Sequence, residues 1–375
     1  MTAPRSRPGT PGGRPSYHAV REAQTGYVYA RAPMLVYWEL TRACDLTCHH
    51  CRAAAIRDRD PDELTFEEAR DVLRQVLEFG PPPPHLVFTG GDPLKRGDLE
   101  ALVREATTLG IGASLAPAAT PLLSREAIQR LRDAGIQSVS LSLDGSDAAR
   151  HDAFRGVPGC FDLTLRAAEW VAEAGLPLQV NTLVTDRTAA DLPAIYHLLA
   201  TLPVERWSLF FLIAVGRGTA LRELDPAAAE RLMGWLYELA AGAPFAIKTT
   251  EAPHFRRVAV ERMRAAGWDG ARIRQSSVGR GFGIRDGNGI LFISRTGDVT
   301  PSGFLPLTAG NVRRARLVDL YRSSALFLAL RDPARFAGRC GRCEYRTICG
   351  GSRARAFAHT GDALASDPLC PYVPA

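Results

Sequence analysis

Six short apolar runs alternate with longer amphipathic stretches between residues 34 and 215, a pattern that few folds can satisfy. Strands separated by helical stretches predict βαβ units, in which the strands are parallel and share one sheet. Because the strand interiors are apolar, we expect both faces of the sheet to be covered. Six units predict an α/β fold with a partial (β/α)6 barrel of the TIM type. The predicted strands are 34–40, 85–91, 112–117, 137–145, 178–185 and 207–215.

The stretches between the strands carry the signals of helices. The first begins at Thr65, is followed three residues later by Glu68 in the spacing of a capping box, and ends at Gly80. Four more barrel helices fit 97–109, 124–134, 161–174 and 189–201. Beyond the barrel, we expect helices over 226–241 and 254–266, a hairpin over 289–302 and a helix over 316–331.

Composition divides the chain into four segments. Residues 1–31 are rich in Pro, Gly and Arg, so they predict a flexible basic tail. We expect the barrel over 32–215, a helical bridging segment over 216–285 and a small α+β domain over 286–375.

The chain is long and apolar enough for a sizeable core, with 375 residues of which 46% are hydrophobic. Membrane spans and a signal peptide are not expected, because no long uncharged apolar run occurs, and this indicates a cytoplasmic protein. The net charge of +6 comes from arginines scattered among acidic residues, so neither a nucleic-acid nor a membrane partner is expected. In a reducing compartment, eight clustered cysteines favour metal or redox chemistry over disulfides.

Three of these cysteines, Cys44, Cys48 and Cys51, follow the first predicted strand. A structural zinc site takes four ligands, and His49 or His50 would have to supply the fourth. A [4Fe-4S] cluster also takes four thiolates when the protein ligates it fully, so three thiols leave one iron open to a small molecule. The loop lies where a barrel of this type binds its ligands, at the carboxyl ends of the strands.

The spacing Cys-x3-Cys-x2-Cys after the first strand resembles the hallmark of the radical S-adenosylmethionine (SAM) enzymes. The resemblance implies a [4Fe-4S] cluster on the three cysteines, whose open iron holds the amino and carboxylate groups of SAM. It also implies reductive cleavage of SAM to a 5'-deoxyadenosyl radical, which abstracts hydrogen from a substrate. A low-potential donor of the flavodoxin or ferredoxin type would supply the electron.

Two further motifs strengthen this resemblance. Gly90, Gly91 and Asp92, in TGGDP at the end of the second strand, are similar to the family's Gly-Gly-Glu motif and imply contact with the ammonium group of SAM. SLSLDG matches the family's fourth strand, which implies that Ser142 or Asp144 faces the ribose. Each also has a structural interpretation, since Gly-Gly-Asp-Pro is a common turn and Ser or Asp can cap the next segment.

Three side chains complete the set of residues considered for the SAM site. Arg155, in HDAFRG, would meet the carboxylate of SAM if it is not simply a surface residue. His50 occupies the position before the last cysteine, where the family keeps an aromatic side chain against adenine. Cys160 stands apart from the cysteine clusters and is expected to be a small buried hydrophobic residue.

A second group of thiols lies near the end of the sequence: Cys340, Cys343, Cys349 and Cys370. Four thiols could form a closed zinc site. The pattern also resembles the SPASM extension of radical SAM enzymes, which carries auxiliary clusters. Ser302 and Arg353 stand where that extension has further cysteines, so we expect one auxiliary [4Fe-4S] cluster.

The substrate is less constrained. The stretch YWELTRACDLTCHHCRAAA resembles enzymes of haem and haem d1 synthesis, which implies a tetrapyrrole or another acidic small molecule. Arginine pairs bind carboxylates well, so the catalytic candidates are Glu251, His254, Arg256 and Arg257. The alternative is that these four residues only begin a helix. Two other functions stay open: modification of a ribosomally made peptide, and a zinc- or cluster-binding protein without catalysis.

Overall fold

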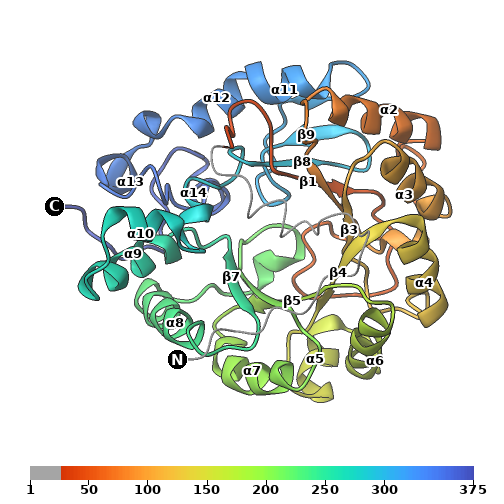
Figure 1. Ribbon diagram of the computed structural model, residues 1–375, viewed down its shortest axis with the longest axis horizontal. Coiled ribbons are helices and arrows are strands. Elements are labelled where there is room, and N and C mark those ends of the chain that lie inside the picture. Colours follow the sequence, from red (N-terminus) through yellow and green to blue (C-terminus); the bar gives the residue numbers. More distant parts are fainter. Residues whose placement is uncertain (1–26) are drawn as a thin grey trace.

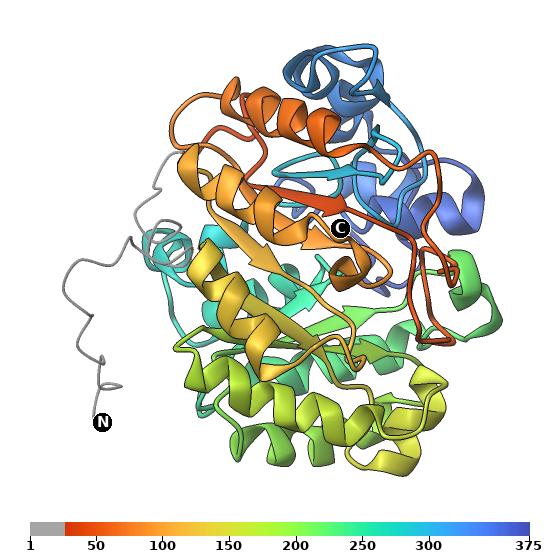
Figure 2. The same ribbon diagram turned by 90° about the vertical axis from the view of Figure 1, so that its right-hand side faces the viewer.

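The computed structural model describes residues 27–375, which form a single ten-stranded sheet wrapped by helices (Figures 1 and 2). The strand order is β10-β9-β8-β1-β2-β3-β4-β5-β6-β7, and neighbours from β8 through β7 are parallel. The sheet curves into an open barrel with β10 and β7 at its edges. The predicted α/β class and partial barrel are confirmed.

The strands are β1 (Leu35–Glu39), β2 (His85–Thr89), β3 (Ala113–Leu115), β4 (Ile136–Ser142), β5 (Leu178–Val184), β6 (Arg206–Phe211), β7 (Ala246–Thr250), β8 (Ile290–Ile293), β9 (Asp298–Thr300) and β10 (Gly310–Asn311). The helices are α2 (Phe66–Leu77), α3 (Leu99–Thr108), α4 (Arg125–Ala134), α5 (Ala148–Arg155), α6 (Cys160–Glu173), α7 (Leu192–Ala200), α8 (Pro226–Leu239), α9 (Phe255–Ala265), α10 (Gly270–Gln275), α11 (Leu317–Ser323), α12 (Ala325–Arg331), α13 (Gly338–Arg342) and α14 (Arg353–Thr360).

The first helix illustrates how local sequence sets these boundaries. The Thr65 hydroxyl accepts a hydrogen bond from the Glu68 amide, and the Glu68 carboxylate accepts one from the Thr65 amide at 2.8 Å. This is the capping box that the sequence predicts, and it satisfies two of the amides that begin α2. The buried side chains of α2 then pack on the outside of the sheet, as Figure 1 shows for the ring of helices.

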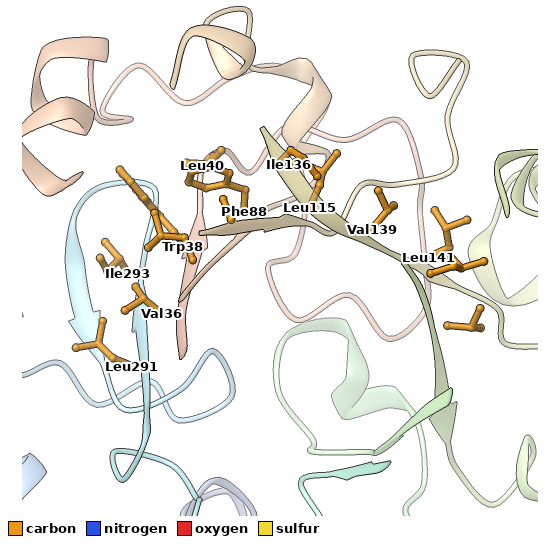
Figure 3. Close-up of a cluster of buried hydrophobic side chains, with 14 of the residues drawn as sticks. Val36, Trp38, Leu40, Phe88, Leu115, Ile136, Val139, Leu141, Leu291 and Ile293 are labelled. Carbon is orange, nitrogen blue, oxygen red and sulfur yellow. The ribbon is translucent and has the colours of Figure 1, made fainter. Parts of the chain in front are cut away.

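The main core lies between the outer face of the sheet and these helices (Figure 3). Val36 and Trp38 of β1 and Val139 and Leu141 of β4 point into it and are at most 2% exposed. The intervening residues point the other way, because side chains alternate along a strand. On β4 these are serines, whereas β1 and β8 contribute aromatic side chains to the same side, so the inner face is mixed in polarity, and not uniformly apolar as expected, and it lines a cavity.

Three differences from the predicted elements affect the regions near the site. The bridging segment 216–285, predicted to be helical, contains β7, which extends the parallel sheet beyond β6. The helix predicted over 316–331 is two helices, because Ser324 is extended and its hydroxyl caps α12. The helix α5 was not anticipated.

Residues 286–375, called the C-terminal extension below, are joined to the barrel through the sheet itself. The hairpin of β8 and β9 forms as predicted, and β8 pairs in parallel with β1. The sheet therefore runs through the boundary placed at residue 285, and the division into domains stays a prediction.

The predicted tail, residues 1–31, lies mostly outside the described residues. Its last part contacts the start of the barrel segment and the C-terminal extension: the Tyr27 hydroxyl donates to the Pro33 carbonyl at 2.7 Å, and the Tyr321 hydroxyl of α11 donates to the Tyr29 carbonyl. In residues 27–375, none of the helices combines the length and apolarity that a bilayer crossing requires.

Candidate active site

The inner face of the sheet encloses a cavity of about 410 Å³, called the central cavity. Every strand from β1 to β8 contributes lining side chains, and the cavity extends from the loop after β1 to the amino ends of the strands. Small polar residues such as Ser138, Ser140 and Ser142 leave the lumen open where larger side chains would fill it. An interior of this kind can hold a ligand with many polar groups.

The three thiols of the first cluster lie together at one end of the central cavity. Cys44, Cys48 and Cys51 all line it. Backbone amides donate to two of the sulfur atoms, Leu46 N to Cys44 Sγ and Ala55 N to Cys51 Sγ, each at 3.4 Å. Burial raises the pKa of Cys44 to about 12, so a metal must displace a tightly held proton there.

Gly90 and Gly91 press against the loop that carries these thiols. A Cβ atom on Gly90 would lie 2.5 Å from the Thr41 carbonyl oxygen, and one on Gly91 would lie 2.4 Å from that of Ala43. The amide of Gly91 also donates to the Thr41 carbonyl at 2.7 Å. Both glycines are therefore required for the close approach of β2 to the cysteine loop.

We expect Gly91→Ala to displace this loop, because backbone atoms block the new methyl group. The holoenzyme should lose at least half of its iron at the three-cysteine site and bind SAM more than tenfold more weakly, measured by iron analysis and equilibrium dialysis. Gly97→Ala is the matched control, since nothing lies within 4 Å of a Cβ at that position. Normal iron content and SAM affinity in Gly91→Ala would contradict this role.

Asp92, unlike Gly90 and Gly91, does not line the central cavity. Its carboxylate, which is 0% exposed, accepts from the Thr120 hydroxyl at 2.7 Å and the Leu94 amide at 3.1 Å. Its own amide donates to the Ala43 carbonyl at 2.7 Å. Asp92 therefore holds the cysteine loop in place, and direct contact with SAM stays a prediction.

Asp144 and Arg155 form a buried ion pair at the cavity wall beside Ser142. Burial raises the pKa of the Asp144 carboxyl, but the attraction of Arg155 and of two nearby histidines, with a hydrogen bond from the Leu183 amide, together outweigh burial and leave that pKa below its ordinary value. Arg155 Nη1 lies 3.7 Å from Cys48 Sγ, and its Nε has no hydrogen-bond partner among residues 27–375. A charged donor beside the cysteine loop suits a carboxylate ligand.

His50 lies flat against Phe154, with ring centroids 4.9 Å apart and planes at 15°. Burial and the nearby Arg155 lower the pKa of His50 to about 4, so the ring is neutral at pH 7. A neutral planar ring on the cavity wall is suited to packing against a base. The predicted contact with adenine is compatible with this position and stays a prediction.

Two of the four catalytic candidates line the central cavity and two do not. Glu251 and Arg256 line the central cavity. His254 is fully buried away from it, with its Nδ1 3.9 Å from an oxygen of Asp367. Arg257 lines the pocket of the second cysteine group instead. Only the first two are therefore placed to touch a substrate.

Glu251 adopts an unusual backbone conformation, with φ +57°, at the end of β7. Its carboxyl accepts from the Ser352 hydroxyl at 2.6 Å, and it lies beside Asp286. Burial and the negative charge of Asp286 raise the pKa of Glu251 well above its ordinary range. A carboxyl with a raised pKa on the wall of the central cavity is a candidate proton donor for a reaction there.

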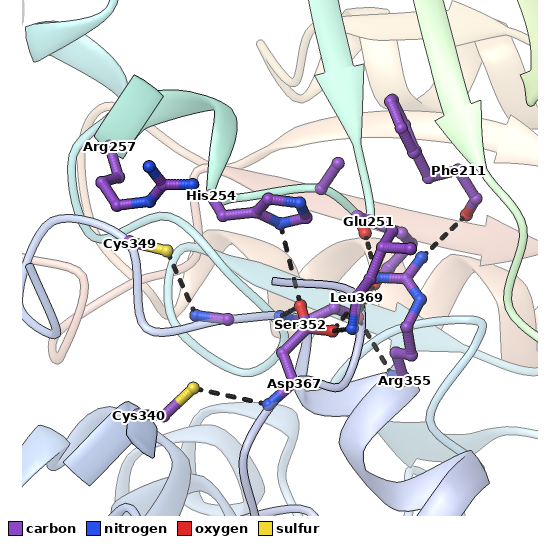
Figure 4. Close-up of polar contacts among 12 residues, drawn as sticks. Phe211, Glu251, His254, Arg257, Cys340, Cys349, Ser352, Arg355, Asp367 and Leu369 are labelled. Atoms are coloured by element: carbon purple, nitrogen blue, oxygen red, sulfur yellow. Dashed lines mark hydrogen bonds and ion pairs between the residues drawn. The ribbon is translucent and has the colours of Figure 1, made fainter. Parts of the chain in front are cut away.

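Arg355 connects this wall to the C-terminal extension (Figure 4). Its guanidinium, 0% exposed, pairs with Glu223 at 3.1 Å and with Asp367 at 3.5 Å. It also donates to the carbonyls of Glu251 at 2.8 Å and Leu212 at 2.9 Å. One side chain therefore ties together the ends of β6 and β7 and helix α14.

The second group of thiols surrounds a pocket of about 30 Å³ in the C-terminal extension. Backbone amides donate to two of them, Gly351 N to Cys349 Sγ and Asp367 N to Cys340 Sγ, each at 3.4 Å (Figure 4). Burial raises the pKa of Cys349 to about 12. The other lining thiols are Cys343 and Cys370.

The donor sets of both groups fit iron–sulfur clusters. Among residues 27–375, no three Cys, His, Asp or Glu side chains are gathered around a single point as one metal ion requires. A [4Fe-4S] cluster binds each thiolate through a different iron, so its ligands need not converge in that way. The hydrogen bonds to the sulfur atoms are those expected around cluster thiolates.

Sequence reasoning missed Arg217, which fixes the cysteine loop from the far side of the cavity. Its Nε donates to the Cys48 carbonyl at 2.9 Å. The preceding Gly216 has φ +55° and leaves no room for a Cβ against the Arg52 carbonyl oxygen, 2.4 Å away. The signal was the Gly-Arg-Gly sequence directly after a predicted strand. Asp286 and Ser352 carried no comparable signal.

Comparison with known proteins gives consistent results. The model of the Radical SAM superfamily matches residues 38–199. An AdoMet-dependent heme synthase from Methanosarcina barkeri is 38% identical over 343 residues, covering 92% of this chain and 97% of that protein. A pre-heme d1 synthase from Dinoroseobacter shibae is 32% identical over 352 residues, covering 90% of this chain and 85% of that protein. The structure of Streptococcus suis SuiB bound to S-adenosylmethionine matches with TM-score 0.71 and 18% identity, covering 91% of this chain and 78% of that chain, a likeness of fold alone.

Proposed function

Because this chain belongs to the radical SAM superfamily, we propose that its substrate is a tetrapyrrole with carboxylate side chains. It is an enzyme that uses SAM and a [4Fe-4S] cluster and takes its electron from a reductant. The relatives named for heme and pre-heme d1 synthesis support the tetrapyrrole class. The likeness to SuiB supports the fold and does not extend to a substrate.

Cys44, Cys48 and Cys51 would hold the cluster, which supplies the electron that cleaves SAM into a hydrogen-abstracting radical. The surrounding residues would bind and orient SAM. Arg155 offers a charged donor for the carboxylate of SAM, and His50 offers a flat neutral surface for its base. The walls of the central cavity exclude water from the reacting carbon.

The charge of the central cavity is the observation that carries the substrate proposal. Seven basic side chains line it against four acidic ones, and one of the four, Glu251, has a raised pKa. A cavity with excess positive charge attracts an anionic ligand and pairs with its carboxylates. The basic side chains are Arg52, Arg155, Arg206, Arg217, Lys248, Arg256 and Arg285.

A substitution of Arg256 tests whether the cavity binds carboxylates, because Arg256 lies at the cavity wall between the barrel and the C-terminal extension. We expect Arg256→Gln to bind a porphyrin with four propionate chains about 10 to 100-fold more weakly, since a hydrogen bond to a charged group contributes roughly 1.5–3 kcal/mol. SAM affinity should be unchanged. Anaerobic titration followed by the visible absorption of the porphyrin measures porphyrin binding, and equilibrium dialysis measures SAM affinity.

Two controls sharpen this experiment. Arg264→Gln changes an exposed arginine of the same helix that does not line the cavity, and it should bind the porphyrin normally. The tetramethyl ester of the porphyrin should bind wild-type protein weakly, because its carboxylates are blocked. Equal binding of acid and ester, or binding of a ribosomal precursor peptide in place of the porphyrin, would overturn the proposed substrate class.

The remaining assignments belong to the same proposal. The second cysteine group would hold one auxiliary [4Fe-4S] cluster that accepts an electron from the oxidised substrate. A flavodoxin or ferredoxin would be the reductant, and the enzyme would work in the cytoplasm, where thiols stay reduced.

A further inference from the structure

Arg353 is a buried cation beside Cys340, one of the thiols of the second cysteine group. It is 0% exposed, and its Nη2 donates to Cys340 Sγ at 3.6 Å. Its other N–H groups donate to backbone carbonyls, at 3.1 Å to Ala363, 2.7 Å to Ala365 and 3.3 Å to Gly351. The guanidinium is thereby held in one orientation, with one edge toward the thiol.

The charge of Arg353 lacks a carboxylate partner within the described part of the chain, since its hydrogen-bond partners there are carbonyls and a thiol. An isolated charge without a counter-ion is costly to bury. A cluster ligated by four thiolates carries a net negative charge, so its presence would supply the missing counter-ion. The sequence thus places a cation where the SPASM resemblance leads one to expect a further cysteine.

The charge of Arg257, which lines the pocket of the second cysteine group, is balanced by carboxylates. Its guanidinium pairs with Glu230 and with Glu261, the latter at 2.9 Å, so two carboxylates offset its charge. Arg353 does not line the pocket itself, but within residues 27–375 it is the arginine that donates a hydrogen bond to a thiol of the second cysteine group. It is therefore the side chain best placed to act on the electronic properties of the site.

We propose that Arg353 sets the reduction potential of the auxiliary cluster by donating a hydrogen bond to the Cys340 thiolate, an inference that rests on the cluster assigned above. One-electron reduction adds one negative charge to the cluster. A fixed buried cation stabilises the reduced form more than the oxidised form and so raises the potential. Arg353 is therefore a positioning residue. It acts on the cluster through Cys340 and does not touch the substrate.

The test is a redox titration of the anaerobically reconstituted holoenzyme, followed by electron paramagnetic resonance. In Arg353→Gln, we expect the equilibrium constant for reducing the auxiliary cluster to fall at least tenfold, which is a shift of about 59 mV toward negative potential. Arg353→Lys, which keeps the charge, should shift less. The three-cysteine cluster is the internal control and should not move.

Arg339→Gln is the matched variant, since Arg339 lines the pocket of the second cysteine group, whereas Arg353 is the residue that donates to the sulfur. It should shift the potential less than Arg353→Gln. A fully loaded Arg353→Gln enzyme with an unchanged potential, or with both clusters shifted equally, would overturn the proposal.

Loss of the cluster in Arg353→Gln would leave the potential unmeasured, so a second measurement uses the native chain. With 15N-labelled arginine, pulsed resonance of the reduced auxiliary cluster should detect a nitrogen coupling that disappears in Arg353→Lys and persists in Arg257→Lys. Absence of that coupling in the wild-type protein contradicts the proposal. Both measurements omit substrate, so failure to convert a porphyrin does not affect them, whereas zinc at the four cysteines would overturn both assignments.

Discussion

Cys48→Ala should abolish reductive cleavage of SAM. Cys48 is the most deeply placed thiol of its loop, 8% exposed, and it receives a contact from Arg155 at 3.7 Å. Two remaining thiolates cannot ligate three irons of a cluster, so the loop loses the metal centre on which SAM binds. We expect formation of 5'-deoxyadenosine to fall by at least a thousandfold, measured by chromatography after single-turnover reduction under anaerobic conditions.

Cys160→Ala is the matched control for this experiment. Cys160 packs in the same small apolar cluster as Cys48, it is 3% exposed, and it lies outside the three-cysteine spacing. As a buried hydrophobic residue it should change stability by no more than about 1–2 kcal/mol and leave SAM cleavage intact. If Cys160→Ala were inactive while Cys48→Ala retained activity, the assignment of ligands on this loop would be wrong.

Arg355→Met should be the most destabilising single change in the C-terminal extension. The substitution leaves Asp367 buried without its cation and frees the carbonyls of Glu251 and Leu212. Removing one partner of a buried ion pair costs about 3–5 kcal/mol. We expect a lower denaturation midpoint in anaerobic urea unfolding of the holoenzyme, with the auxiliary cluster lost before the three-cysteine cluster.

Arg342→Ala provides the comparison, because Arg342 is an exposed arginine of α13 in the same extension. Exposed substitutions of this kind change the free energy of unfolding by about 0.5 kcal/mol or less. Equal midpoints for the Arg355 and Arg342 variants would mean that Arg355 does not join the extension to the barrel.

Most of the barrel could be predicted from local sequence patterns. The six barrel strands and the capping box at Thr65 were readable because apolar runs and cap spacing act over a few residues. Strand β7 was not readable, because it is an edge strand with half-exposed side chains and the polar sequence AIKTT. The alternating serines of β4 indicate an inner face of mixed polarity, which the expectation of apolar strand interiors did not take into account.

The parts of the site formed by residues close together in the sequence could be predicted. The parts formed where distant segments pack together could not. The two cysteine groups and the paired glycines line pockets as their spacing suggested. The carboxyl pair of Glu251 and Asp286 depends on packing between the end of β7 and the start of the extension, which sequence separation conceals. Arg353 was noted only as a missing cysteine, since a side-chain hydrogen bond to sulfur has no sequence signature.

The pairing of β1 with β8 also bears on the order in which this protein matures. Leu35 stands beside Ile290, so the strand that leads into the cysteine loop is completed by residues that leave the ribosome late. Until then one edge of β1 is open to other nascent chains, and contacts between such remote residues form slowly. We therefore expect the cysteine loop that follows β1 to be held in its final position only once β8 has paired with β1.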